Sequence, residues 1–380
     1  MTQCCGRAII TLSNMARLSF SQISKYGQCP RSYKLYYVDK LRERSATAFL
    51  AFGSAMDEAL NAVLKSLQKQ KVNVDYKAAF DECWQTVEVN KRKYPLMDCT
   101  LIGYAKADFV EDLLQPDDIR FLRAKLSEYG VEEMESYTIL KNQLEEERSR
   151  RATVHFSENR HKALNLLNWL SMRRKAHLML DAYVRDIVPK IESVTAVQKQ
   201  VELKSDCGSS LIGYVDAIIR FKGDNEDTVV DNKTSSSPYA EDQVKNSQQL
   251  SLYTYALGLK KAGYAVMQKN IRMNREKVCS VCSFESSSAH KTCNNTVDGK
   301  RCGGTWNEKV KPEAITQLII DSIDEQTQHV VIDNIAEVND AIAANVFPKN
   351  LSACKNLYGN PCPYINACWK NQTDYLEKVE

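Results

Sequence analysis

A strand, a short polar turn and a second strand, all within residues 211–233, constrain the fold of this chain more than any other stretch. Residues 211–221 are rich in β-branched and aromatic side chains, residues 222–227 have the composition of a turn, and residues 228–233 resume the strand pattern. The pattern predicts a β-hairpin inside an α/β protein.

Three charged side chains stand in these otherwise apolar strands, namely Asp216, Asp231 and Lys233. With the turn centred between Asp224 and Asn225, Asp216 lies opposite Lys233 and diagonal to Asp231. Two carboxylates can hold a hard divalent cation such as Mg²⁺, and a nearby ammonium can stabilise charge that develops on a phosphate. The arrangement therefore suits phosphodiester cleavage. The alternative is a structural ion pair on a solvated sheet face, because short Asp-x-Lys strings are common.

Other strings flank this hairpin in a fixed order. Downstream, residues 248–257 have helical spacing, so Gln249 and Tyr253 share one helix face. Upstream, residues 29–33 (CPRSY) and 52–59 (FGSAMDEA) stand in or just before helical patterns. The order of these strings is more specific than any one of them.

Taken in this order, the strings resemble the PD-(D/E)XK nuclease superfamily, specifically its RecB-like branch, which includes the CRISPR-adaptation nucleases and the bacterial AddB exonucleases. The resemblance runs from Leu18 to Cys368. It implies an α/β fold with a mixed central sheet flanked by helices, a restriction-endonuclease-like core. It also implies a deoxyribonuclease that hydrolyses DNA with a Mg²⁺- or Mn²⁺-activated water, acting as an exonuclease on single strands or duplex ends.

The resemblance assigns roles to the residues of the hairpin. Asp216 and Asp231 match the family's metal-binding carboxylates, and Lys233 matches its catalytic lysine. Asn232 matches the residue whose backbone carbonyl binds the metal.

The resemblance also covers two helices. Gln249 and Tyr253 match the family's Gln-x-x-x-Tyr helix, which positions DNA and the lysine. One position departs from the pattern, since the family usually has a histidine four residues after the helix glycine, whereas Gly53 is followed by Asp57. A carboxylate ligand there suits Mg²⁺ or Mn²⁺. The alternative is an ordinary exposed acid beside Glu58, and the matching alternative function is a weak or inactive nuclease-fold module for DNA binding or assembly.

Thirteen cysteines are many for a cytosolic enzyme of 380 residues, and they form clusters. Four of them lie in a polar segment with little apolar content, at Cys279, Cys282, Cys293 and Cys302. Such a segment folds when a metal supplies the free energy, and four thiolates suit tetrahedral Zn²⁺. Two alternatives remain: His290 replaces one thiolate, or the cysteines form disulfides, which an intracellular setting disfavours. A zinc ribbon here is a candidate contact surface for a protein partner.

A second cluster joins the two ends of the chain. The RecB-like families with a [4Fe-4S] cluster take one ligand from a Cys-Pro near the N-terminus and three from the C-terminus. The resemblance therefore implies iron-sulfur ligands at Cys29, Cys354, Cys362 and Cys368. Thiolate spacing alone does not separate iron-sulfur from zinc, so a second zinc site and reduced core thiols are the alternatives.

Charge and hydropathy constrain the function and location of the protein less than the motifs do. The net charge of +3 excludes a strongly basic nucleic-acid footprint, so DNA contact depends on local patches such as Arg42/Arg44 and residues 173–175. The alternative is that these patches are ordinary solvated helix faces. No run of 18 apolar residues and no secretory signal pattern is present, so we expect a soluble, cytoplasmic protein that makes no membrane contact.

These patterns predict an order of segments. A zinc segment is expected at the tip of paired strands at residues 265–273 and 314–321. The expected segments are a leader (1–16), an N-terminal helical part of the nuclease domain (17–75), a helical insertion (76–191), the nuclease core (192–275), a zinc-ribbon insertion (276–306) and a C-terminal part with the iron-sulfur cysteines (307–380).

Overall fold

The computed structural model describes residues 17–70, 74–104, 109–132, 135–150, 156–204, 210–286, 290–355 and 361–379. The expected leader, residues 1–16, lies outside them. The α-helices are α1 (Phe20–Gln28), α2 (Pro30–Tyr33), α3 (Ala48–Gln68), α4 (Tyr76–Cys83), α5 (Pro116–Glu128), α6 (Tyr137–Arg150), α7 (Glu158–Asp186), α8 (Gln248–Leu257), α9 (Glu325–Ala343) and α10 (Ile365–Lys370). The strands are β1 (Arg17–Ser19), β2 (Leu41–Glu43), β3 (Ala46–Thr47), β4 (Thr86–Val89), β5 (Arg92–Pro95), β6 (Ile102–Gly103), β7 (Ile191–Lys204), β8 (Ser210–Phe221), β9 (Thr228–Ser235), β10 (Lys261–Gln268), β11 (Arg272–Cys279), β12 (Glu285–Ser286), β13 (Thr296–Val297), β14 (Lys300–Arg301), β15 (Trp306–Glu313), β16 (Thr316–Ser322) and β17 (Leu376–Lys378).

The centre of the molecule is a mixed sheet, as the sequence predicts. Strand β8 pairs antiparallel with β7 and β9, β9 pairs parallel with β10, and β10 pairs antiparallel with β16. The short strand β1 pairs parallel with the first residues of β8. Strand β8 therefore has β1 beside it at one end and β9 beside it at the other.

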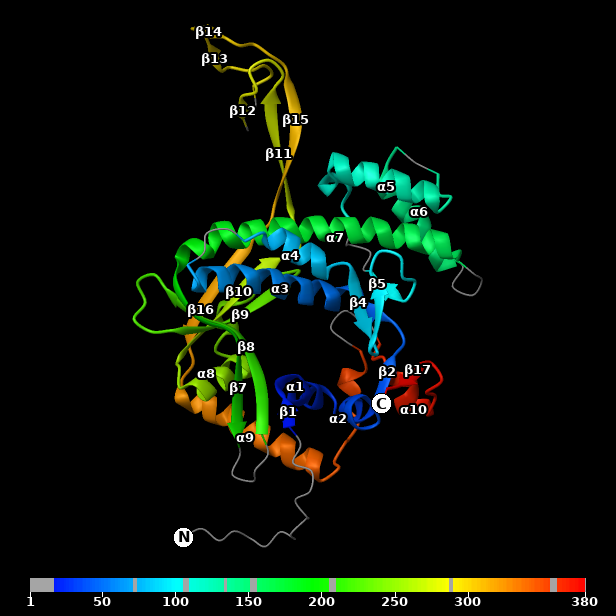
Figure 1. The fold of residues 1–380 in the computed structure, drawn as a ribbon, viewed down its shortest axis with the longest axis vertical. Helices are drawn as coiled ribbons and strands as arrows, with labels where there is room; N and C mark the ends of the chain where they lie inside the picture. The colour runs from blue at the N-terminus through cyan, green and yellow to red at the C-terminus, as the bar shows by residue number, and fades with distance from the viewer. Residues whose placement is uncertain are drawn as a thin grey trace.

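Helices cover both faces of this sheet (Figure 1). Helices α3 and α7 contribute to one apolar core, which Ala217 and Ile219 of β8 and Val230 of β9 enter. Helices α8 and α9 contribute to the other core, which includes Val229 and Val266. Successive residues of β9 thus enter opposite cores, which follows from the two-residue period of a strand.

The sequence of α3 explains how one helix supports both the core and a polar group. Phe52, Met56, Leu60 and Leu64 recur at every fourth residue and are buried, so they form one apolar stripe. Asp57 follows Met56 and emerges at the side of the stripe, where it stays exposed.

The segment expected to be a helical insertion contains α4, α5, α6 and α7, and also a hairpin that was not anticipated. Strands β4 and β5 pair around Asn90 and Lys91, both of which have positive φ angles, of 51° and 65°. Two residues with positive φ make the tight turn that suits a hairpin. Val87 and Val89 are buried on one face, so the alternating pattern of β4 accounts for the difference from a purely helical segment.

The cysteine-rich segment lies at the end of a two-stranded extension. Strands β10 and β16 pair within the central sheet, and the same two stretches of chain continue as the antiparallel pair β11 and β15. Figure 1 shows this pair leaving the body of the molecule, with β13 and β14 at its far end. The predicted strand pairing and the tip position of the cysteines are confirmed.

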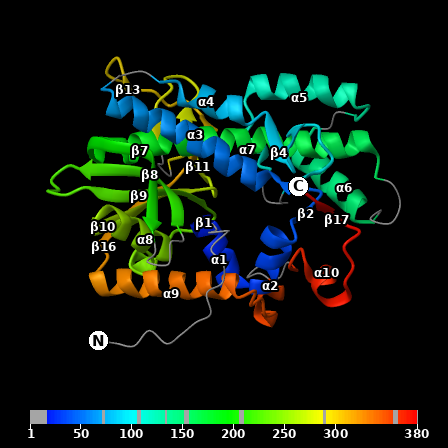
Figure 2. The same ribbon diagram turned by 60° about the horizontal axis from the view of Figure 1, so that its bottom comes forward.

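The N-terminal helices and the C-terminal segment lie side by side. Strand β17 pairs with β2, with Leu376 opposite Glu43. The hydroxyl of Tyr364 donates to the carbonyl of Leu41 at 3.0 Å, and that of Tyr26 donates to Val346 at 2.6 Å. Figure 2 shows α10 and β17 next to α2 and β2.

Candidate active site and cysteine clusters

The two strands of the central hairpin separate at the charged residues. Strands β8 and β9 pair from Ile219↔Thr228 to Ala217↔Val230, and the pairing stops there. The next residues are Asp216 and Asp231, so both carboxylates stand at a fork between the strands.

The register of the hairpin differs from the prediction. The pairing places the centre of the turn between Gly223 and Asp224, one residue earlier than expected, and it makes Asp216 level with Asp231 rather than Lys233. Gly223 has a φ of 85°, a left-handed conformation that glycine adopts without strain, and this allows the earlier reversal. Because the shift is two residues, the charged groups of the two strands still meet.

Short contacts connect the groups at the fork. The backbone N–H of Asn232 donates to Oδ2 of Asp216 at 2.9 Å. Nζ of Lys233 lies 2.5 Å from Oδ2 of Asp231. This contact is an ion pair and not a well-directed hydrogen bond, because Oδ2 has no hydrogen-bond partner of good geometry among the described residues. Asp231 is 2% exposed, so its negative charge is almost enclosed.

Burial and mutual repulsion set the protonation of the carboxylates. Burial, with the nearby charges of Asp231 and Asp57, raises the pKa of Asp216 to about 7, although the hydrogen bond from Asn232 opposes the shift. Burial also raises the pKa of Asp231, and Lys233 opposes it. Without a cation, Asp216 therefore titrates near neutral pH, and a divalent cation would favour its charged form.

Lys233 is held in its charged form. Burial by itself lowers the pKa of this ammonium, but Asp231 and Asp216 outweigh that effect and raise the pKa well above its usual value. The ammonium is therefore a permanent positive charge at the fork.

Asp57 of α3 lies close enough to the fork to interact with the charges of Asp231 and Lys233. Partial desolvation raises the pKa of Asp57 to about 6, with Asp231 and Glu58 adding to the shift and Lys233 opposing it. The side chain nevertheless stays exposed to solvent. The structure thus brings Asp57 near the other charges and leaves it accessible.

Helix α8 supplies the two residues expected from its spacing. Nε2 of Gln249 donates to the hydroxyl of Tyr253 at 3.2 Å. Tyr253 is buried against Gly213 of β8, where an added Cβ would come within 2.6 Å of its ring. A glycine at this position therefore lets the ring lie against the strand, and the Tyr253 hydroxyl interacts with the charges of Asp216 and Asp231.

Three further tyrosines near the fork were not identified from the sequence. The rings of Tyr239 and Tyr264 stack edge to face at 5.2 Å, and both hydroxyls interact with Asp231 and Lys233. The buried hydroxyl of Tyr183 on α7 has no hydrogen-bond partner among the described residues and interacts with Asp216. No spacing signal connects these residues, because they lie far apart in the sequence, in α7, in the segment after β9 and in β10.

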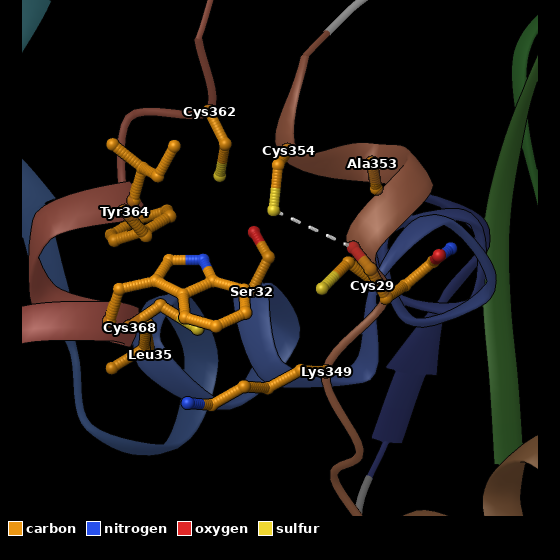
Figure 3. Close-up of a pocket in the computed structure, with 12 residues that line it drawn as sticks. Cys29, Ser32, Leu35, Lys349, Ala353, Cys354, Cys362, Tyr364 and Cys368 are labelled. Carbon is orange, nitrogen blue, oxygen red and sulfur yellow. Dashed lines mark hydrogen bonds between the residues drawn. The ribbon is translucent and has the colours of Figure 1, made fainter.

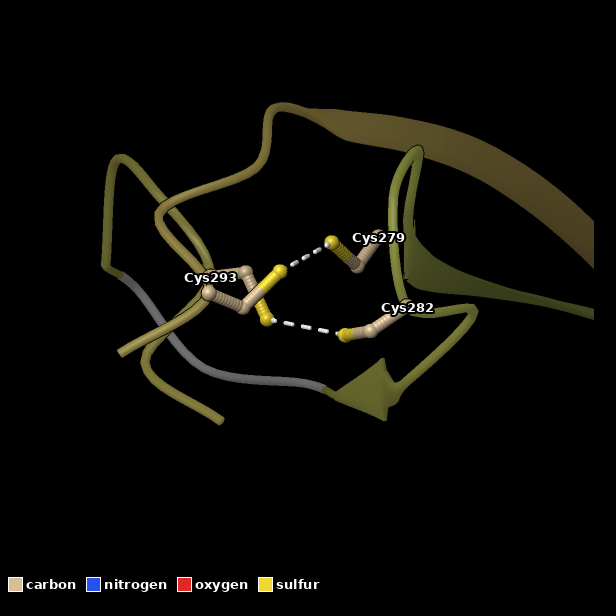
Figure 4. A group of neighbouring side chains, drawn as sticks. Cys279, Cys282 and Cys293 are labelled. Atoms are coloured by element: carbon tan, nitrogen blue, oxygen red, sulfur yellow. Dashed lines mark hydrogen bonds between the residues drawn. The ribbon is translucent and has the colours of Figure 1, made fainter. Parts of the chain in front are cut away.

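The four ribbon cysteines converge, as expected for a single metal ion. Their sulfurs all lie within 4.8 Å of one another, with Sγ of Cys279 3.6 Å from Cys302 and Sγ of Cys282 3.6 Å from Cys293 (Figure 4). Zinc bound tetrahedrally by four thiolates at about 2.3 Å needs sulfurs about 3.8 Å apart, so the set fits zinc. His290 is outside this group, and its backbone carbonyl accepts a hydrogen bond from Trp306.

The second cysteine set surrounds a cavity instead of converging on one point. Cys29, Cys354, Cys362 and Cys368 all line it (Figure 3). Burial raises the pKa of the Cys362 thiol, and the neighbouring Cys29 and Cys354 add to the shift. In the described part of the chain, the ribbon is the one group of three or more potential ligands gathered within 4.8 Å. The thiols of the cavity set are thus less closely gathered than those of the ribbon.

The basic patches proposed for DNA contact are partly engaged within the protein. Arg173 forms an ion pair with Asp81, and Arg174 lies 2.5 Å from Asp118. The guanidinium of Arg42 stacks on the ring of Tyr36. Arg173 and Arg174 therefore connect helices of the insertion and do not form a free cationic surface. In the described part of the chain, no helix has both the length and the apolar content that a membrane span needs.

Comparison with known proteins now places the chain in a family. A search of curated proteins finds no match. A solved structure described as "Crystal structure of SSO0001" is 14% identical over 59% of this chain and 87% of that chain, and its TM-score of 0.21 is too low to support an argument. A family model described as the PD-(D/E)XK nuclease superfamily matches residues 17–135 and 120–369, which is most of the sequence. The chain belongs to the PD-(D/E)XK nuclease superfamily.

Proposed function

We propose that this protein is a metal-dependent DNA nuclease of the RecB-like branch, acting as an exonuclease on single strands or duplex ends. The observation that carries the proposal is the fork, where Asp216, Asp231 and Lys233 meet at the point where β8 and β9 separate. The strings that resemble the RecB-like branch, including the Gln249–Tyr253 pair, support the finer assignment.

The fork has the ligand chemistry that a hard cation needs. Asp57, Asp216, Asp231 and the backbone carbonyl of Asn232 would hold Mg²⁺ or Mn²⁺ through oxygen atoms. When bound, the cation would activate the attacking water and neutralise charge on the phosphate. A cation would offset the unfavourable burial of these carboxylates, which raises the pKa of both Asp216 and Asp231.

Lys233 would act as a fixed charge and not as a proton acceptor. Its pKa is raised by Asp231 and Asp216, so the side chain is an ammonium at neutral pH. An ammonium in a largely buried site stabilises negative charge in the transition state more strongly than one in water. The side chain is 33% exposed, so a substrate phosphate can reach it.

The two cysteine sets have structural roles in this proposal. The ribbon would hold Zn²⁺ through Cys279, Cys282, Cys293 and Cys302, at the end of an arm suited to contact a protein partner. The cavity set would hold a [4Fe-4S] cluster that joins the N- and C-terminal parts of the nuclease domain. Neither metal takes part in bond cleavage.

The central test is the purified Asp231→Ala protein. We expect cleavage to fall by a factor of about 10² to 10³, because the substitution removes one charge that acts in the transition state. Circular dichroism should show an unchanged fold. The matched control is Glu226→Ala, which changes a carboxylate in the same hairpin's turn, 46% exposed and remote from the fork. Undiminished Mg²⁺-dependent cleavage by Asp231→Ala would refute the assignment.

The choice of substrate tests the finer proposal. Single strands labelled at either end, linear duplex and circular duplex would be compared with the same enzyme preparation. An exonuclease should degrade both linear forms and leave circular DNA intact. Rapid cleavage of covalently closed circles would reject the exonuclease assignment but would still support a nuclease.

Asp57 supports a second candidate, a nuclease-fold module with weak or no activity, because it replaces the family's usual histidine. We expect Asp57→Ala to lower cleavage about 10-fold or more at limiting Mg²⁺, whereas Asp57→His should retain activity and shift the preference toward Mn²⁺. Glu58→Ala is the control, since Glu58 is the adjacent exposed acid. Equal, negligible cleavage by the wild-type protein and all three variants would favour the inactive module.

A further inference from the structure

One long surface of the molecule has an acidic end and a basic end. It comprises the exposed side of α9, residues 344–355 and α10, and we call it the α9–α10 surface. The chain follows one edge of the molecule from α9 past α2 to α10 (Figures 1 and 2). This surface lies outside the candidate active site and the ribbon.

The acidic end of the surface is α9. Residues 314–348 contain six acidic residues and no lysine or arginine. Asp333 and Glu337 are four residues apart and both exposed, so they form a stripe along one side of the helix. Within α9, therefore, no lysine or arginine neutralises these carboxylates.

The basic end of the surface begins at Lys349. Residues 341–373 contain three lysines and no acidic residue. Nζ of Lys349 lies 4.8 Å from the centroid of the Trp369 ring. Trp369 is nevertheless 51% exposed, so much of its ring is open to contact with another molecule. The basic end thus combines positive charge with an accessible aromatic ring.

Contacts through α1 connect the two ends. Gln28 of α1 and Asn334 of α9 line one groove. The backbone carbonyl of Gln28 accepts a hydrogen bond from Nδ2 of Asn350 at 2.8 Å. Asn350 in turn lines the cysteine cavity together with Lys349 and Trp369. The surface is therefore continuous from α9 to Trp369.

Two exposed aliphatic side chains come between α9 and α10. Val346 is 49% exposed and Leu351 is 65% exposed. An aliphatic side chain gains free energy when another apolar surface removes it from water, and a phosphate backbone offers little such surface. The middle of the surface therefore suits a protein better than a nucleic acid.

We infer that the α9–α10 surface binds a second copy of this chain. A two-fold axis through the aliphatic middle would place the acidic end of each copy on the basic end of the other, so that two attractive contacts form at once. Val346 and Leu351 of both copies would meet near the axis. An apolar centre with a charged rim is the usual composition of a protein interface, and a tryptophan is often its strongest contact. The inference does not rest on the proposed nuclease function.

The first test is the mass of the anaerobically prepared, full-length protein, measured by analytical ultracentrifugation over a range of protein and salt concentrations. We expect a concentration-dependent dimer that weakens at high salt, because salt screens the charged contacts. Leu351→Asp should raise the dimer dissociation constant about 10-fold or more, since it places a charge at the apolar centre. Val297→Asp is the matched control, because Val297 is a 42% exposed valine of β13, at the end of the β11–β15 extension.

Charge reversal tests the pairing of the two ends. One variant carries Lys349→Glu and Lys370→Glu, which make both ends acidic, and the other carries Asp333→Lys and Glu337→Lys, which make both ends basic. Each variant alone should dimerise about 10-fold more weakly than the wild type, or worse, because like charges then meet at both contacts. An equimolar mixture should form a heterodimer of nearly wild-type affinity, since each contact again joins opposite charges. Recovery in the mixture would also show that both variants fold.

A wild-type protein that stays monomeric over the whole concentration range would overturn the inference. A dimer that Leu351→Asp and both charge variants leave unchanged would place the interface elsewhere and overturn it as well. Two reversed variants that are folded by circular dichroism but do not associate when mixed would reject the pairing of the ends. A monomeric wild type whose DNA binding is weakened by Lys349→Glu and Lys370→Glu would assign the basic end to nucleic acid instead. The association measurements do not involve cleavage, so their failure leaves the nuclease assignment unaffected.

Discussion

The two cysteine clusters differ in how far apart their members lie in the sequence. The ribbon gathers four thiols from 24 consecutive residues, Cys279 to Cys302, and their sulfurs lie within 4.8 Å of one another. The cavity set joins Cys29 to three cysteines near the other end of the chain. A metal held by the first set would close a short loop at the end of the β11–β15 extension, and one held by the second set would connect two distant parts of the chain.

The two cysteine sets also differ in how much apolar packing surrounds them. Near the ribbon thiols, Val281 and Phe284 are exposed, so little apolar burial supports the fold there. The cavity set lies beside a small core that includes Leu35, Tyr364 and Leu376, and the β2–β17 pairing adds backbone hydrogen bonds. We therefore expect the ribbon to depend on a bound metal for its local fold, whereas a metal group held by the cavity set would add a long-range connection to a region that already packs.

The largest expected effect is on the cavity set. Cys29→Ser should abolish the brown colour and the bound iron of anaerobically prepared protein, and lower the free energy of unfolding by about 4–5 kcal/mol, by analogy with other cross-links that close long loops. Iron analysis, visible absorption and urea denaturation would measure these changes.

The control for this prediction is Cys83→Ser, because Cys83 is an exposed thiol of α4 outside the set. It should keep both colour and stability. A colourless anaerobic wild-type protein with full nuclease activity would contradict the iron-sulfur assignment. Of the two cysteine sets, the ribbon would then be the one proposed to bind a metal.

The ribbon should give a smaller and local effect. Cys279→Ser is expected to lose one zinc per chain and to make residues 276–306 sensitive to protease, while the main unfolding transition stays within about 1 kcal/mol of wild type. Elemental analysis and limited proteolysis are the measurements.

The control for the ribbon is His290→Ala. His290 lies outside the group of converging ligands, so this variant should keep its zinc. Loss of zinc in His290→Ala, with Cys293 or Cys302 dispensable, would favour a mixed histidine and cysteine site.

The same contrast explains what the sequence could predict. The ribbon ligands are neighbours in the sequence, so their spacing and polar surroundings were sufficient to predict a convergent set at the tip of paired strands. The cavity set was inferred from family resemblance, because no local pattern connects Cys29 to Cys354 across the chain. Its placement around one cavity agrees with that inference, and its metal remains a proposal.

At the fork, the sequence identified the charged residues of the site, but it did not predict which residues lie next to them. Asp216, Asp231 and Lys233 were identified from the strand pattern, but the register was wrong by two residues because the turn depends on the conformation of Gly223. Tyr264 was missed because β10 comes to lie parallel to β9 only after the chain has crossed over through α8. Packing across separate elements decides such contacts, and no single segment of sequence contains that information.

The smallest expected effect concerns a single close approach within the ribbon. An added Cβ at Gly304 would lie 2.6 Å from Sγ of Cys279 and 3.0 Å from the side chain of Val281. Val281 is 72% exposed and can move outward, whereas Cys279 can move only by leaving the ligand set. Gly304 is not among the glycines with positive φ, so alanine introduces the clash without backbone strain. We therefore expect Gly304→Ala to weaken zinc binding about 10-fold in a chelator competition, with the iron content and the main unfolding transition unchanged. An accompanying loss of iron would mean that the two cysteine sites are energetically connected. Unchanged zinc affinity would mean that the packing of Gly304 against Cys279 is looser than the close approach implies.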